Sequence, residues 1–264
     1  MHIKMIVTDL DGTLLRDDKT ISDYTAEVFS RLRDKGIIVM FATGRAAMNT
    51  AESAKMIMPH GIISSNGASI TVMGNSIFKQ PMKYDAVKVI VNELCELDGI
   101  KLLIDYGDYF LTNHADYQAQ FNIAHCDAVK DNPNGVMKIS IETADNSSLS
   151  NIDFAALGCY CHGFADEVLY NIMATGVSKL AAVKIAAAHF NIDITKIAAF
   201  GDDQNDIEML RGCGIGVAME NAIDEAKAAA DYICGSNEND GVAKWLEKHL
   251  LQAQELAISP SESH

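Results

Sequence analysis

The chain has 264 residues, 48% of them hydrophobic and 22% charged, which is ordinary for a globular protein with a large core and one or two domains. Its formal net charge of −15 argues against nucleic acids and anionic membranes as partners, because both attract basic proteins. No apolar run approaches the roughly 20 residues that cross a bilayer, and no signal peptide precedes the first strand, so we expect a cytoplasmic protein.

The chain begins with a short apolar strand around Ile6 and Val7 that runs directly into Asp9, Asp11 and Gly12. A buried parallel strand has no structural need for carboxylates at its end, and glycine allows a sharp turn just beyond them. This pattern suits a nucleophilic carboxylate, a second carboxyl that handles protons, and a hard cation. For an isolated motif of this kind, an Asx turn that caps loop amides is the more common explanation.

A helix, a second strand and a second helix follow. Ser22 is predicted to cap a helix that ends at Gly36, and the next strand spans residues 37–42. Thr43 and Gly44 then separate this strand from a predicted helix at residues 46–57, which favours an anion site at the helix start. A simple helix cap at Thr43 explains this segment equally well.

A third strand is predicted at residues 61–64, and Asn66 and Gly67 indicate a turn before residues 68–72. The alternation of strands and helices up to this point predicts βαβ units and a parallel sheet.

The pattern changes near Pro81. Helices are predicted at residues 86–98, 115–128 and 148–157, and strands at 101–105, 109–112, 136–141, 159–162 and 168–173. Short links between strands favour an antiparallel sheet with helices on one face. We therefore expect residues 82–173 to form an inserted α+β domain, and residues 1–81 and 174–264 to form an α/β core domain.

Acidic and basic residues then reappear at element ends. Ser178 is predicted to cap a helix at residues 180–190, which places Lys179 in the first turn, where the helix dipole disfavours a cation. Such a local conflict is typical of functional sites, although a solvated lysine is an equally good explanation. A strand at residues 197–200 ends in Gly201–Asp206, whose three aspartates favour a bound cation over a solvated loop. Strands at 214–219 and 232–234 and helices at 222–230 and 242–252 complete the chain.

Four stretches taken together resemble the haloacid dehalogenase superfamily and, within it, the Cof-type phosphatases with an α+β cap of type C2B. They are Asp9–Thr13, Ala42–Arg45, Lys179 and Gly201–Asp206, in this order along the chain. The resemblance implies a doubly wound parallel-sheet α/β core with an inserted α+β cap domain. It also implies a Mg²⁺-dependent phosphatase that acts on small phosphorylated metabolites, such as sugar phosphates or phosphorylated cofactors.

The resemblance assigns a role to each matched acid. Asp9 is expected to attack the phosphate monoester and form an aspartyl-phosphate. Asp11 is expected to protonate the leaving alcohol and then to deprotonate the attacking water. The implied ligands of Mg²⁺ are the Asp9 carboxylate, the Asp11 backbone carbonyl and Asp202. Asp203 and Asp206 are expected to lie beside the site.

The resemblance also implies a set of groups that bind the phosphoryl oxygens. They are the backbone amide of Leu10, Thr43, the amide of Gly44, Lys179 and Asn205. Lys179 and the metal would together neutralise the charge that develops in the transition state, and Asp206 is expected to pair with Lys179. A local concentration of cations of this kind is what a chain of net charge −15 needs in order to bind an anion.

Two alternatives remain open for the same site. A phosphomutase uses the same aspartyl-phosphate, but it would need basic residues that face the site from the cap, for which Lys101, Lys130 and Lys138 are the few candidates. A sensor that binds phosphorylated metabolites without turnover would not need both Asp9 and Asp11.

Overall fold

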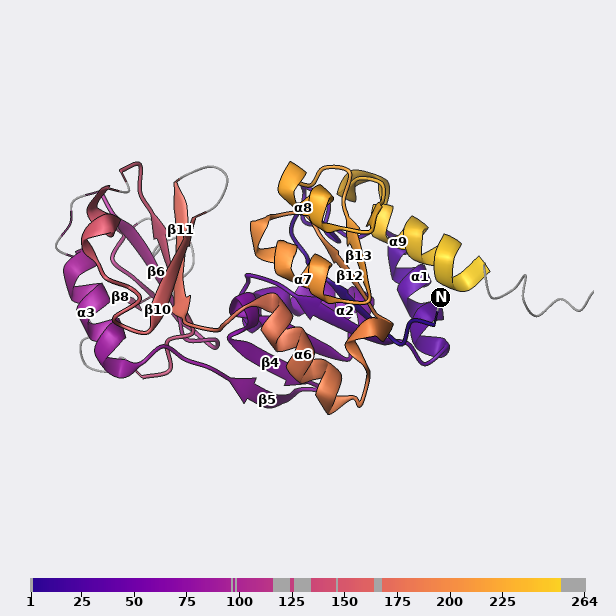
Figure 1. Ribbon diagram of the computed structural model, residues 1–264, viewed down its shortest axis with the longest axis horizontal. Helices are drawn as coiled ribbons and strands as arrows, with labels where there is room; N and C mark the ends of the chain where they lie inside the picture. Colours follow the sequence, from indigo (N-terminus) through magenta and orange to yellow (C-terminus); the bar gives the residue numbers. More distant parts are fainter. Residues whose placement is uncertain are drawn as a thin grey trace, which may run out of the picture.

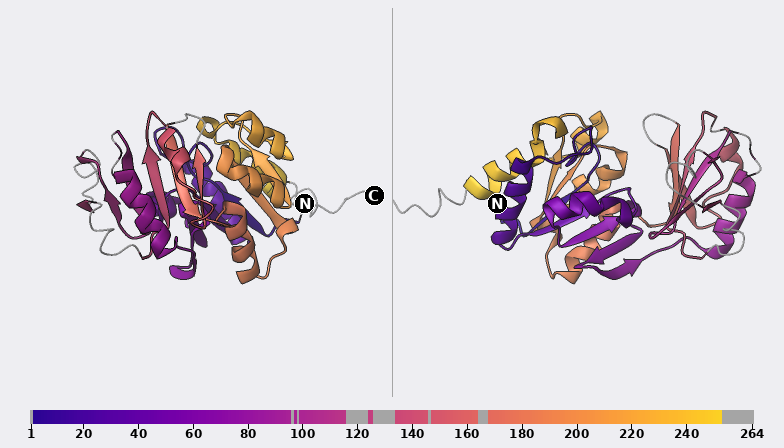
Figure 2. Two further views of the ribbon diagram at one scale, coloured as in Figure 1. Left: turned by 60° about the vertical axis from the view of Figure 1, so that its left-hand side comes forward. Right: turned by 180° about the vertical axis from the view of Figure 1, so that it is seen from behind.

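The computed structural model describes residues 2–95, 97, 99–115, 124–125, 134–145, 147–163 and 168–252. It contains two β-sheets that lie side by side in every view (Figures 1 and 2). The larger sheet is built from both ends of the chain and the smaller one from its middle. None of the described helices combines the length and the apolar character needed to cross a membrane.

The larger sheet has eight strands. They are β1 (Met5–Thr8), β2 (Ile38–Ala42), β3 (Gly61–Ser64), β4 (Ser69–Val72), β5 (Asn75–Lys79), β12 (Ile197–Gly201), β13 (Ile215–Ala218) and β14 (Tyr232–Ile233). Their order is β14-β13-β12-β1-β2-β3-β4-β5, parallel from β14 to β3 and antiparallel at β4 and β5. Strand β5 was not predicted, because its residues are all exposed or half-buried and show no apolar alternation.

The two faces of this sheet carry separate apolar cores. Ile6 of β1 packs in the cluster that holds Phe29 and Leu32, whereas Met5 and Val7 pack in the cluster on the opposite face. Successive side chains of a strand point to opposite faces, so a strand covered on both sides must be apolar throughout. This explains the continuous hydrophobic runs of β1, β2 and β12.

Helices cover both faces of the larger sheet (Figure 1). They are α1 (Asp23–Asp34), α2 (Ala51–Ile57), α6 (Lys179–His189), α7 (Ile207–Gly212), α8 (Asp224–Ala229) and α9 (Gly241–Leu246), which continues as the π-helix η7 (Glu247–Gln252). Short 3₁₀ turns are η1 (Ala47–Thr50), η2 (Ser65–Gly67), η4 (Ile194–Lys196), η5 (Gln204–Asp206) and η6 (Asn237–Asn239). The predicted caps are confirmed, because Ser22 accepts a hydrogen bond from the Thr25 amide and Ser178 accepts one from the Ala181 amide. The single helix predicted at residues 46–57 is instead a 3₁₀ turn, η1, followed by α2.

The smaller sheet has six strands and one described α-helix, α3 (Tyr84–Cys95). The strands are β6 (Lys101–Asp105), β7 (Phe110–Thr112), β8 (Ala124–His125), β9 (Lys138–Glu142), β10 (Cys159–Gly163) and β11 (Leu169–Ala174). Their order is β10-β11-β9-β6-β7-β8, antiparallel except between β7 and β8. Helix α3 packs on one face of this sheet through a third apolar cluster. An antiparallel sheet with a helix on one face is the α+β arrangement that was predicted for residues 82–173.

Two helix predictions in this region need correction. Residues 124–125 form strand β8 instead of helix, and the rest of the predicted helix at 115–128 lies outside the described residues, apart from Ala115 at its start. The helix predicted at 148–157 is only a 3₁₀ turn, η3 (Ser147–Asn151), followed by further turns. Here Ser150 donates its hydroxyl to the carbonyl of Ser147, and local bonds of this kind compete with the α-helical pattern. The domain boundaries at 81/82 and 173/174 stay a prediction.

Candidate active site

Three carboxylates meet at the carboxyl edge of the larger sheet. Asp9 directly follows β1, and Asp202 and Asp206 follow the neighbouring parallel strand β12. One oxygen of each of these acids lies within 4.8 Å of the others. Asp9 and Asp206 are buried and Asp202 is half-buried, so their charges would repel strongly without cations nearby. The cluster that was predicted from two acidic strand ends is therefore present.

Lys179 supplies one of these cations. Its ammonium group lies 2.8 Å from Asp9 and 2.7 Å from Asp206, and the residue is only 1% exposed. Burial alone would lower the pKa of Lys179, but the charges of the two acids outweigh it and raise the pKa. Lysine at the first position of α6 is thus explained by tertiary ion pairs that override the helix dipole.

Asp206 has both of its carboxylate oxygens engaged. One accepts from Lys179, and the other accepts from the backbone amides of Asp202 and Asp203, at 3.1 and 3.2 Å. Asp206 therefore holds the lysine and the start of the acidic loop in place, which is the pairing that the family resemblance implied. Asp203 caps η5 and lines the cavity in front of Asp9.

The Asp202 carboxylate accepts from a neutral hydroxyl, whereas Asp206 accepts from the Lys179 ammonium and two backbone amides. The hydroxyl of Thr13 donates to it at 2.5 Å, while burial and the nearby charge of Asp206 raise its pKa from 3.8 to about 7. Burial also raises the pKa of Asp9, an effect that the ammonium of Lys179 opposes. Both carboxylates would be stabilised in their charged form by a further cation.

Asp11 lies beside this cluster but has other partners. Both of its oxygens accept from Arg45 at 2.6 Å, and Lys19 adds a third ion pair at 2.9 Å. Burial raises the pKa of Asp11, but the hydrogen bonds and charges of Arg45 and Lys19 outweigh it and hold the pKa below its usual value. The Asp11 side chain is 41% exposed, so it faces an open space.

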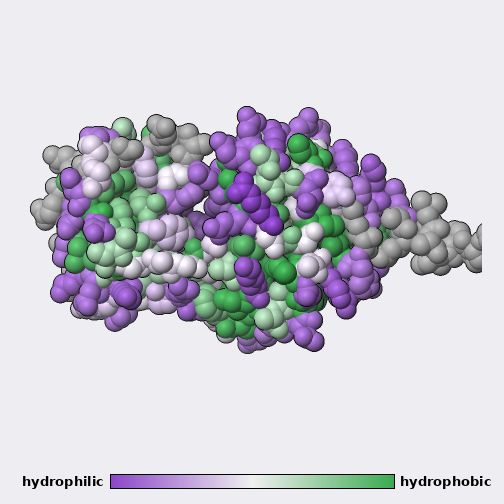
Figure 3. Space-filling model, viewed as in Figure 1, coloured by the Kyte–Doolittle hydropathy of each residue, from purple (hydrophilic) through white to green (hydrophobic). Residues whose placement is uncertain are grey.

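That space is a cavity of about 360 Å³ between the two sheets. It is lined by Asp9, Asp11, Asp202 and Asp203 from the acidic loops and by Thr43, Gly44 and Asn205 from the expected phosphate site. Figure 3 shows a notch in the surface between the two parts of the molecule. The side chain of Leu10 is buried in the core, and its carbonyl accepts from the amides of Thr13 and Leu15 to close the turn after β1.

The turn η2 contains a contact that the sequence did not predict. Asn66 is buried in a left-handed conformation with φ of +56°, and its side-chain oxygen accepts from the side-chain NH₂ group of Asn205 at 2.9 Å. Its backbone N–H donates to the carbonyl of Thr43. The sequence pair Asn66 and Gly67 predicts only a turn. Asparagine tolerates left-handed backbone, and that was the one available sign of a special position.

The smaller sheet also reaches into the site. Lys138 of β9 donates to the carbonyl of Gly44 at 2.6 Å, and Asp105, its cross-strand neighbour on β6, accepts from the Ser65 hydroxyl at 2.6 Å. Burial lowers the pKa of Lys138, while the charge of Asp105 opposes this shift. These contacts join the smaller sheet to the Gly44 loop and to the turn η2. They therefore hold Lys138 in the wall of the cavity.

Comparison with known proteins assigns the chain to a family. The sequence profile described as haloacid dehalogenase-like hydrolase matches residues 6–246, which is most of the chain. The chain belongs to this family.

Individual known proteins resemble the chain over nearly its full length. The 5-amino-6-(5-phospho-D-ribitylamino)uracil phosphatase YcsE of Bacillus subtilis is 29% identical, with 95% of this chain and 97% of the relative covered. The HMP-PP phosphatase of Enterobacter sp. is 27% identical, with 97% and 99% covered. A haloacid dehalogenase-like hydrolase structure from Bacteroides thetaiotaomicron has a TM-score of 0.81 at 25% identity, with 93% of this chain and 99% of that chain covered. The subclass IIB sugar phosphatase BT4131 shares the fold, with a TM-score of 0.80 at 24% identity and 93% and 98% covered.

Proposed function

We propose that this protein is a Mg²⁺-dependent phosphatase that hydrolyses monoesters of small phosphorylated metabolites through an aspartyl-phosphate on Asp9. The observation that carries the proposal is the position of Asp9. Its side chain is buried against Lys179, and Asp9 and Asp11 line the same cavity. The family is a hydrolase family, and the relatives named above are phosphatases of small molecules.

The proposed reaction has two steps. In the first, an oxygen of Asp9 attacks phosphorus, and the bond to the ester oxygen breaks while Asp11 gives that oxygen a proton. In the second, Asp11 takes a proton from water, the water oxygen bonds to phosphorus, and the bond to Asp9 breaks. Arg45 and Lys19 hold Asp11 in its charged form, so a bound phosphate must draw these cations away before Asp11 can carry a proton.

The acidic cluster fits a magnesium ion. Asp9 and Asp202 offer hard carboxylate oxygens close together. The pKa of each is raised, and a divalent cation beside them would lower both pKa values by stabilising the charged carboxylates. Asp206 is not assigned as a ligand, because Lys179 and two backbone amides already use its oxygens. The proposed ligands are therefore Asp9, Asp202 and the carbonyl of Asp11. When bound, Mg²⁺ neutralises the phosphoryl charge and orients the group for attack.

The remaining matched residues are proposed to bind the phosphoryl oxygens. They are the amides of Leu10 and Gly44, the hydroxyl of Thr43, the ammonium of Lys179 and the side chain of Asn205. We also propose that residues 82–173 act as a cap domain over this site, because their sheet supplies the cavity wall through Lys138. Of the three lysines that a mutase would use, only Lys138 lines the cavity, and it donates to the carbonyl of Gly44; Lys101 pairs with Glu142, and Lys130 lies outside the described residues.

The deciding experiment measures phosphate release from 4-nitrophenyl phosphate with Mg²⁺ and with EDTA. We expect release with Mg²⁺ that EDTA abolishes and that excess Mg²⁺ restores. Release that continues unchanged in EDTA would contradict the metal assignment. If no phosphate is released from this ester or from a panel of phosphorylated metabolites, the phosphatase proposal is wrong.

The metal proposal also predicts a pH dependence of stability. In the metal-free protein the pKa of Asp202 is raised from 3.8 to about 7, so the folded state keeps a proton that the unfolded chain releases. Stability without metal should therefore fall as pH rises between these two values. Mg²⁺ binds the ionised form, so the increase in melting temperature caused by Mg²⁺ should grow from pH 6 to pH 8. Differential scanning fluorimetry across this range checks it, and an increment that shrinks with pH would contradict it.

Gly12 is predicted to be required for the position of Asp202. Its φ is +74°, and a β-carbon at this position would overlap the Oδ2 atom of Asp202. Gly12→Ala should therefore lower the free energy of unfolding by about 1–3 kcal/mol and remove most phosphatase activity.

Gly36 provides a matched control for this substitution. It has the same φ of +74°, but a β-carbon there would meet nothing within 4 Å. Gly36→Ala should carry the backbone cost alone and keep full activity, as measured by urea unfolding and phosphate release. Equal activity losses in the two variants would mean that backbone strain, and not displacement of Asp202, explains the effect.

A further inference from the structure

A second, larger cavity adjoins the one that holds Asp9. Its volume is about 550 Å³, and it shares four lining residues with the inner cavity, namely Arg45, Asn49, Leu103 and Phe110. The two cavities therefore adjoin, and Arg45 lines both of them. If the proposed function is right, a substrate with its phosphate at Asp9 has room to extend past Arg45 into this outer cavity.

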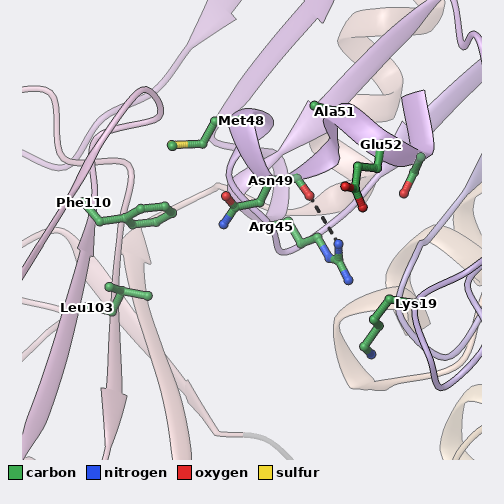
Figure 4. Close-up of a pocket in the computed structure, with 9 residues that line it drawn as sticks. Lys19, Arg45, Met48, Asn49, Ala51, Glu52, Leu103 and Phe110 are labelled. Carbon is green, nitrogen blue, oxygen red and sulfur yellow. Dashed lines mark hydrogen bonds between the residues drawn. The ribbon is translucent and has the colours of Figure 1, made fainter. Parts of the chain in front are cut away.

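The inner wall of the outer cavity is apolar and is built from both sheets. Met48 comes from η1 on the larger sheet, whereas Leu103 and Phe110 come from β6 and β7 of the smaller sheet. Figure 4 shows the Phe110 ring and the Met48 side chain extending toward one another across the opening. Met48 is 49% exposed, although it is a large hydrophobic residue beside an aromatic ring. A flat ring between these side chains would gain stacking and sulfur–aromatic contacts and cover this exposed surface.

The rest of the outer cavity lining is polar. Asn49 offers a side-chain amide and Glu52 offers a carboxylate, while the ammonium of Lys19, which pairs with Asp11, lies at the same cavity (Figure 4). A hydrocarbon ring would leave these groups unmatched, because it has no donors or acceptors at its edge. A nitrogen heterocycle with amino or carbonyl substituents satisfies both sides, since its faces are apolar and its edge forms hydrogen bonds.

We propose that the outer cavity is the binding site for the non-phosphorylated end of the substrate, and that this end carries a planar nitrogen heterocycle. The proposal rests on the phosphatase function and adds the substrate class to it. Met48 and Phe110 are assigned as specificity-determining residues that contact the faces of the ring. A phosphorylated sugar alone would occupy the inner cavity and leave Met48 uncovered, because Met48 lines only the outer cavity.

The test uses two esters that differ only in the ring. Uridine 5′-monophosphate and ribose 5-phosphate carry the same phosphorylated sugar, with and without a pyrimidine. With wild-type protein and Mg²⁺, kcat/KM for the uridine ester should be about tenfold or more above that for the sugar phosphate. Met48→Ala and Phe110→Ala should each lower it several-fold to tenfold, mainly through KM. Met48 lines only the outer cavity, so Met48→Ala should leave ribose 5-phosphate within about twofold of wild type.

Met73→Ala serves as the matched control. Met73 is 72% exposed on the turn between β4 and β5 and does not line either cavity, so both esters should be unaffected by its loss. Phe110→Leu keeps an apolar side chain without the ring and should fall between wild type and Phe110→Ala. Equal kcat/KM for the two esters, or equal losses for both in Met48→Ala, would overturn the ring assignment while the phosphatase function stands. No hydrolysis of either ester, or of 4-nitrophenyl phosphate, would overturn the function itself.

Discussion

Replacement of Asp9 by asparagine should reduce phosphate release by about 10⁴-fold or more, the largest effect that we expect from any single substitution. An amide has the shape of the carboxylate but cannot attack phosphorus to give a stable acyl phosphate. The fold should be kept, because the asparagine oxygen can still accept the hydrogen bond that Lys179 donates to Asp9. Burial disfavours the charge on Asp9, so the neutral variant should unfold at a similar or higher urea concentration than wild type.

The measurement compares initial rates on 4-nitrophenyl phosphate at saturating Mg²⁺, with urea unfolding on the same preparations. Asp34→Asn removes an exposed acid at the end of α1 and should keep the wild-type rate, so it controls for the change in net charge. An Asp9→Asn rate within tenfold of wild type would assign the nucleophile to another group. Loss of activity together with loss of folding would contradict the expectation that asparagine keeps the hydrogen bond to Lys179.

The acidic residues at the carboxyl edge of the larger sheet were predictable because the signals for them lie in the local sequence. Asp9 and Asp202 each follow an apolar strand, and parallel strands deliver their carboxyl ends to one edge. Lys179 was recognisable because it breaks the helix-dipole rule at the start of α6. In each case the signal lies within a few residues of the functional side chain. The resulting acidic cluster and its lysine are present in the structure.

The rest of the site depends on contacts between distant segments. The pairing of Asp11 with Arg45 joins residues 34 positions apart, and no spacing rule relates them. Strand β5 carries few apolar residues, so edge position and pairing with β4 decide its structure. Met48 and Phe110 line one cavity because the smaller sheet lies beside the carboxyl edge of the larger one. Hydrophobic periodicity predicts which face of an element is buried, but not which surface covers it.

The second large effect is expected at Lys179. Lys179→Met keeps the length and apolar stem of the side chain but removes the ammonium that pairs with Asp9 and Asp206. Two buried carboxylates would then face each other without a cation, and breaking a buried pair in this way typically costs about 3–5 kcal/mol. Phosphate release should fall by about 10²–10³-fold or more, because the transition state also loses a charge that stabilises it.

A double variant separates the structural part of this effect from the catalytic part. Lys179→Met combined with Asp206→Asn removes one of the stranded charges, so urea unfolding should recover part of the lost stability while activity stays low. Lys184→Met changes an exposed lysine on the same helix and should leave both properties unchanged. Recovery of activity together with stability in the double variant would show that Lys179 acts only by balancing Asp206, and would remove it from the phosphate-binding set. Stability without activity is the expected result, because no other buried cation is bonded to Asp9 among the described residues.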